Sequence, residues 1–138
     1  MTPEQIKLVQ TSFARVFPLK ARMAQGFYDR LFEIAPGVRP LFPENMTQQR
    51  EKLADSLVFV VKNLDAPEHL ALTVAGLARR HAKYGARPEH FGPVGEALIH
   101  ALDAHSPKPL TDQEKEAWTQ AYTTIVNAML PAMEEAAA

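Results

Sequence analysis

The chain has 138 residues, 46% of them hydrophobic, and its 15 Lys and Arg against 16 Asp and Glu give a net charge of −1. This length fits one domain with a core of its own, so we expect a single domain over residues 1–138. The near-neutral charge argues against nucleic-acid binding, and the absence of cysteine excludes disulfides, Cys-bound zinc, iron–sulfur clusters and CxxCH cofactor attachment.

The sequence shows no membrane or secretion signal. Its longest unbroken aliphatic or aromatic run is LVFVV at residues 57–61, far short of the ~20 residues that a membrane span needs. Residues 1–5 contain no basic start followed by an apolar stretch. We therefore expect a soluble, cytoplasmic protein without a membrane span.

The first two segments of the chain have helical apolar spacing. Thr2 and Gln5 have the positions of a capping box, which predicts that a helix begins directly after Thr2. Pro18 should end or bend this helix. A second helix then reaches about Ile34.

Residues 35–43 form a proline-rich connector that is unusually apolar for a loop. We expect Leu41 and Phe42 to pack against the rest of the domain. The next two helices span about residues 47–64 and 67–84, because both segments carry an apolar stripe in steps of three and four.

The last third of the chain predicts two further helices. Gly85 is the expected cap of the preceding helix, and Pro88 opens the next one. Residues 111–114 form a second capping box before the last helix, whose alanine-rich end, residues 136–138, we expect to fray. The result is an all-α domain of six or more helices, which should cross at angles rather than form a regular bundle.

His81 is the histidine of greatest interest among the five in the chain. It continues the apolar stripe of Leu70, Val74 and Leu77 in helical steps, so it should point inward. By itself, an inward histidine is more often bonded to a backbone carbonyl than used as a ligand. No HxxxH or HExxH pair exists, so a zinc hydrolase has no support.

Gln49 is placed to oppose His81. It lies sixteen residues before Asp65, and His81 lies sixteen after. In an antiparallel hairpin with its turn near Asp65, each side chain would be ~24 Å from the turn, at 1.5 Å per residue. Two polar groups would then face each other in an apolar slot. Such a slot suits a flat apolar cofactor with an axial imidazole on one side and a gas ligand on the other.

Tyr28 adds a third polar group on the inward face of the second helix. Taken singly, it would be an ordinary buried tyrosine, and Phe42 would be ordinary loop packing. The series Tyr28, Phe42, Gln49, Leu53 and His81, in this order, is much less expected by chance.

These residues lie in segments that resemble the globin family, in particular single-domain bacterial haemoglobins related to flavohaemoglobin haem domains and neuroglobin-like bacterial globins. The resemblance covers nearly the whole chain and implies a globin fold of about six to eight helices around a pocket for haem b. The segments are GFYDRLF at 26–32, LF at 41–42, QQREKL at 48–53, RRHAKYG at 79–85, VGE at 94–96, AW at 117–118 and AY at 121–122.

The resemblance also implies roles for individual residues. His81 would bind the haem iron, while Tyr28 and Gln49 would donate hydrogen bonds to bound O₂ on the other side. Phe42 would stack on the haem. The other haem-binding positions would be Leu53, Leu77, Tyr84, Phe91 and Val94, with Lys52 and Arg80 as candidate partners of the propionates.

The function that follows is reversible binding of O₂, and of CO and NO, at a ferrous haem that Gln49 leaves five-coordinate, since an amide binds iron poorly. One alternative is a nitric oxide dioxygenase or weak peroxidase, which would need an external reductase because the chain contains no reductase domain. Phe91 and Met133 replace the tyrosine and glutamate that hold the histidine in flavohaemoglobins, so we rank this second. A gas sensor with a separate partner and a helical interaction domain without haem are further alternatives.

Overall fold

The computed structural model describes residues 1–137, which fold into six α-helices and three short 3₁₀ helices with no strand among them. The all-α prediction is therefore confirmed. We expected the C-terminal end of the last helix to fray, but α6 continues to Ala137. Ala138 lies outside the described residues. The elements are α1 (Pro3–Val16), η1 (Phe17–Leu19), α2 (Lys20–Ile34), η2 (Pro36–Leu41), α3 (Thr47–Lys62), α4 (Pro67–Lys83), η3 (Pro88–His90), α5 (Phe91–Ala104) and α6 (Asp112–Ala137).

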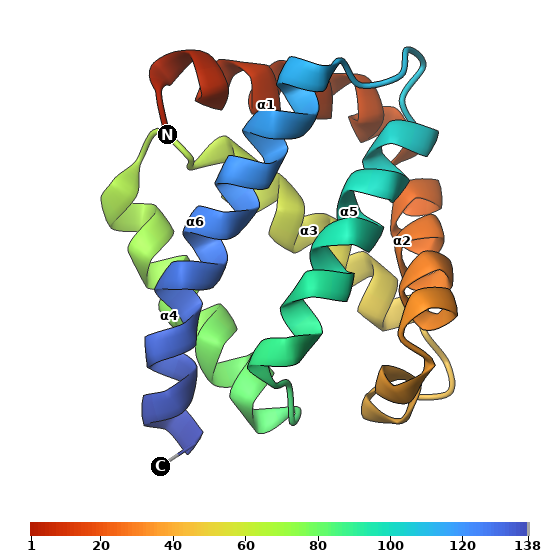
Figure 1. Ribbon diagram of the computed structural model, residues 1–138, viewed down its shortest axis with the longest axis vertical. Helices are drawn as coiled ribbons and strands as arrows, with labels where there is room; N and C mark the ends of the chain where they lie inside the picture. Colours follow the sequence, from red (N-terminus) through yellow and green to blue (C-terminus); the bar gives the residue numbers. More distant parts are fainter. Residues whose placement is uncertain (138) are drawn as a thin grey trace.

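The helices cross one another at steep angles, as expected, and form no regular bundle (Figure 1). α6 packs along α4 and crosses α1, and α5 packs along α2. α3 crosses behind these helices and rests mainly on α2. No helix within residues 1–137 offers a stretch long and apolar enough to cross a membrane.

Both predicted capping boxes form. The backbone N–H of Gln5 donates to Thr2 Oγ1 over 3.1 Å, and the Thr2 N–H donates to Gln5 Oε1 over 2.9 Å. Thr111 and Glu114 repeat this pair of bonds at the start of α6. Glu114 also forms an ion pair with Arg15, with 2.8 Å between Oε1 and Nη2, which connects the start of α6 to the end of α1.

Gly85 ends α4 four residues after His81. Its φ of +85° lies in the left-handed region, which residues with a Cβ enter at a cost. The N–H of Ala86 donates to the carbonyl of His81 over 3.0 Å, and the N–H of Gly85 donates to Ala82 over 3.2 Å. These two bonds form a Schellman motif, which satisfies the last carbonyls of the helix that carries His81.

Gly85→Ala should lower the free energy of unfolding by about 1–2 kcal/mol, because alanine must then occupy the left-handed region. Urea unfolding followed by circular dichroism measures the change. Gly92→Ala is the matched control: a Cβ at Gly92 meets nothing within 4 Å and its φ is not positive. The control should be neutral or slightly stabilising, and equal losses in both variants would contradict the argument.

The structure differs from the expectations in two places. α3 and α4 do not pack into a hairpin: they diverge from their connection near Asp65 and hardly touch, because α4 packs on α6 and α3 on α2. Leu41, expected to be packed, is 41% exposed. Its neighbour Phe42 does pack, with its ring centroid 5.4 Å from those of both Tyr28 and Phe32.

Candidate functional site

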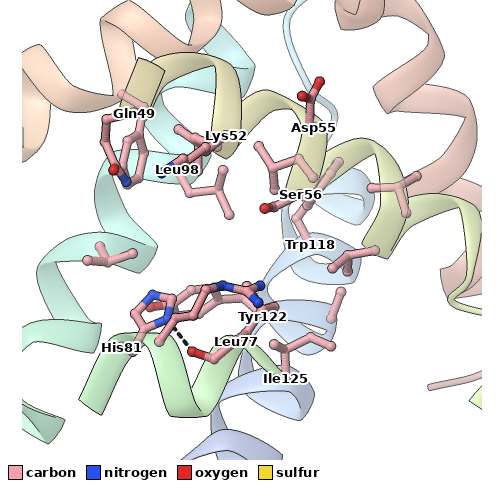
Figure 2. Close-up of a pocket in the computed structure, with 18 of the residues that line it drawn as sticks. Gln49, Lys52, Asp55, Ser56, Leu77, His81, Leu98, Trp118, Tyr122 and Ile125 are labelled. Carbon is pink, nitrogen blue, oxygen red and sulfur yellow. Dashed lines mark hydrogen bonds between the residues drawn. The ribbon is translucent and has the colours of Figure 1, made fainter. Parts of the chain in front are cut away.

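A cavity of about 530 Å³ fills the space between the diverging helices α3 and α4. Its walls are mostly apolar and come from every α-helix of the chain. Figure 2 shows Gln49 at one edge and His81 across the cavity from it. The predicted site residues that line the cavity are Tyr28, Gln49, Lys52, Leu53, Leu77, Arg80, His81, Tyr84 and Val94.

His81 is held in one orientation by its own helix. Its Nδ1 lies 2.7 Å from the carbonyl oxygen of Leu77, one turn earlier, and donates its hydrogen there (Figure 2). Nε2 is then the nitrogen without a hydrogen, and its lone pair is available to a metal in the cavity. A ring nitrogen bonded to a carbonyl in this way is the usual support of a histidine ligand.

The surroundings of His81 keep it neutral. Burial lowers the pKa of the imidazole, the charge of Arg80 lowers it further, and the bond to Leu77 only partly opposes these effects. The neutral ring is the form that binds metal, since a protonated imidazole has no free lone pair.

Tyr28 and Gln49 form a hydrogen-bonded pair on the other side of the cavity. Gln49 Nε2 donates to the Tyr28 hydroxyl over 3.0 Å, so the tyrosine's own hydrogen remains free to donate. Burial raises the pKa of this hydroxyl above its ordinary value, which keeps it protonated. The pair therefore presents a donor whose oxygen is already polarised by an amide.

Phe42 does not line the cavity but lies behind Tyr28. The Tyr28 ring is 5.4 Å from that of Phe42 and 4.8 Å from that of Phe27, both edge to face. Here Phe42 helps to fix the direction of the Tyr28 hydroxyl.

Phe91 also stands outside the cavity lining, beside His81, with ring centroids 6.2 Å apart and planes at 33°. The Tyr122 hydroxyl donates to the Phe91 carbonyl over 2.6 Å, which fixes the start of α5. Met133 belongs to the same apolar cluster as Phe91. The imidazole of His81 thus has an apolar surface beside it and the Leu77 carbonyl as its hydrogen-bond partner.

Three of the polar site residues lie at the exposed mouth of the cavity. Lys52 and Arg80 are exposed, and neither forms an ion pair within residues 1–137. Tyr84 beside them is 53% exposed. Two unpaired cations and a hydroxyl at the edge of an apolar cavity suit a ligand with an apolar body and carboxylates at one end.

Several lining residues escaped prediction as site residues. Trp118, Tyr122 and Ile125 of α6 and Val61 of α3 all face the cavity. The sequence marks those of α6 as a helical apolar stripe, but such a stripe looks the same whether it faces another helix or a cavity.

The globin family model matches residues 25–129 of this chain. The chain belongs to the globin family. Among its relatives, the flavohemoprotein of Vibrio cholerae is 28% identical over 127 residues, which cover 88% of this chain and 32% of that protein. The flavohemoprotein of Rhizobium meliloti is 31% identical over 113 residues, which cover 80% of this chain and 28% of that protein.

This globin thus spans about a third of the length of these curated relatives. A bacterial globin structure from Campylobacter jejuni superposes with a TM-score of 0.85 over 97% of both chains at 23% identity. That match confirms the fold predicted from the resemblance.

Globins bind haem, and the cavity of this chain fits that group. Its volume of about 530 Å³ is within the range of roughly 300–1,000 Å³ usual for organic ligands. The walls are apolar, as the porphyrin requires. His81 Nε2 is oriented and neutral, and cations stand at the mouth, where carboxylates would meet water.

Proposed function

We propose that this globin binds O₂ reversibly, with CO and NO as alternative ligands, at a haem b held by His81. The observation that carries the proposal is the pairing of an oriented, neutral imidazole with the Tyr28–Gln49 donor pair across one apolar cavity. When bound, the haem would supply the iron atom at which a diatomic ligand can bind, with His81 holding the group and Tyr28 and Gln49 across the cavity from it.

The residues of the chain would set the strength of that binding. The Tyr28 hydroxyl would donate a hydrogen bond to an O₂ ligand that carries partial negative charge, and such a bond is strong between apolar walls. Gln49 supports Tyr28 and has a second amide hydrogen for the ligand. Because an amide binds iron poorly, Gln49 leaves the ligand position open. Lys52 and Arg80 would pair with the propionates and orient the haem.

Haemin titration with absorption spectra tests this proposal. We expect a Soret band, a single broad visible band after reduction with dithionite, and a sharp shift on adding CO. Trp118 is the single tryptophan of the chain and lines the cavity, so its fluorescence should be quenched in step with the Soret band. Split ferrous bands would mean that a protein side chain fills the ligand position, and no Soret band would contradict haem binding itself.

Nitric oxide dioxygenation is the second candidate. It joins NO, O₂ and one electron to give nitrate, so it needs an electron donor, which we propose to be an external reductase. The Tyr28–Gln49 pair favours it, because donors that stabilise charge on O₂ also favour its reaction with NO. The surroundings of His81 weigh against it, since within residues 1–137 the Nδ1 of His81 donates to the Leu77 carbonyl, and a neutral carbonyl makes the imidazole less electron-donating than a carboxylate would. Nitrate formation from NO with a reductant present separates the two candidates.

A further inference from the structure

A second hollow lies on the surface between α1 and α3, with a volume of about 440 Å³. Its lining is mostly apolar and includes Phe13, Phe17 and Val58. Val61 lines this groove and also lines the central cavity. One valine side chain therefore stands between an open apolar groove and the proposed haem pocket.

The contact between α1 and α3 is slight beside Val61. α1 packs mainly on α6 and touches α3 only lightly. Gln10 of α1 bridges the two helices, with its Nε2 donating to the Val61 carbonyl over 3.1 Å. Val61 is in the last turn of α3, and the ends of helices open with less free energy than their centres.

A pair of aromatic rings joins the same two spaces. Phe13 lines the groove, Trp118 lines the cavity, and their ring centroids are 6.0 Å apart. The wall between groove and cavity is thus one layer of apolar side chains. A polar molecule would lose its hydrogen bonds in crossing it, whereas an apolar diatomic has none to lose.

We infer that the groove between α1 and α3 is an entry route for apolar diatomic ligands, with Val61 as its gate and Gln10 as the latch on that gate. This inference rests on the proposed function. The route is separate from the mouth at Lys52, Arg80 and Tyr84, where charged and polar side chains meet water. It would admit O₂, CO and NO to the cavity without water.

Val58→Phe tests the route in the haem-loaded protein, because Val58 lines the groove beside Val61 but not the cavity. Association and release of CO and O₂ are measured by flash photolysis and stopped flow. Narrowing a route changes entry and exit equally, so both rate constants should fall by the same factor while Kd stays unchanged. If ligands use two routes equally, closing this one lowers both rate constants roughly twofold, and the decrease is greater if most ligand uses this route. Gln10→Ala removes the hydrogen bond to the Val61 carbonyl and should raise both rate constants instead.

Leu72→Phe is the control, because Leu72 is 76% exposed and lines neither the cavity nor the groove. It adds an aromatic ring outside both spaces, and we expect both rate constants to stay unchanged. Equal slowing in Leu72→Phe and Val58→Phe would overturn the inference, as would unchanged rates in both Val58→Phe and Gln10→Ala.

Xenon gives a readout that does not depend on ligand kinetics. In the diamagnetic CO-bound protein, xenon pressure should shift the methyl resonances of Val58 and Val61, since xenon occupies apolar spaces. No shift at either residue would contradict the route. If the parent protein binds CO normally but neither the variants nor xenon has any effect, the entry route is wrong and the proposed function stands. If the parent protein takes up no haem, the proposed function itself is wrong.

Discussion

His81→Ala should abolish stable haem binding. The wild-type ring is neutral, held through Nδ1 by the Leu77 carbonyl, and aligned with Nε2 free for iron. Removing a group that merely orients a metal ligand costs roughly 10–100-fold in affinity, and removing the ligand itself should cost more. Transfer of haem from the variant to an excess of apomyoglobin, followed at the Soret band, measures the loss.

His105 offers a matched control for this experiment. Its Nδ1 lies 2.8 Å from the Ala101 carbonyl, four residues earlier, which is the same arrangement as in His81. His105 does not line the cavity, however, and its ring lies against Gly26. His105→Ala should retain haem, and added imidazole should restore a histidine-like spectrum to His81→Ala. Normal haem retention in His81→Ala would contradict the assignment of His81.

Tyr28→Phe should speed the release of O₂ by about ten- to a hundredfold, because one hydrogen bond to a charged group is worth about 1.5–3 kcal/mol. The variant keeps the ring between Phe27 and Phe42 and removes only the hydroxyl. Stopped-flow displacement of O₂ by CO measures the release rate. CO gains little negative charge on binding, so CO release serves as an internal control and should change much less.

Gln49→Leu should also speed O₂ release, and its effect should not add to that of Tyr28→Phe. Part of the influence of Gln49 passes through the Tyr28 hydroxyl, to which its amide donates over 3.0 Å. In the double variant this part is lost only once, so a double-mutant cycle should show a coupling energy. O₂ release rates equal to the parent's in both single variants would contradict the donor pair. Strictly additive effects of the two substitutions on the release rate would contradict the arrangement in which Gln49 acts through Tyr28.

Local features of the structure were open to prediction because their causes lie within a few neighbouring residues. The caps at Thr2 and Thr111 depend on a side chain and a backbone N–H three residues apart. The end of α4 depends on the glycine that can adopt a positive φ. The inward direction of His81 and Tyr28 follows from helical periodicity, which any helix packed on one face must obey.

The composition of the site depended on contacts between helices far apart in sequence. That α3 and α4 diverge is decided by their packing on α2 and α6, which no local pattern records. Phe42 packs against Tyr28 and does not line the cavity, and Leu41 is 41% exposed; both outcomes also depend on contacts between segments far apart in sequence.

The helices, their caps and the inward histidine could be predicted from local sequence patterns, and the globin resemblance added the kind of cofactor. The donation from Gln49 to Tyr28, and the position of Val61 between a surface groove and the central cavity, emerged from the packing of the helices. The physical reason is that helix formation and capping depend on neighbours within one turn. A cavity and its donors arise only where several helices, each packed elsewhere, leave a space between them.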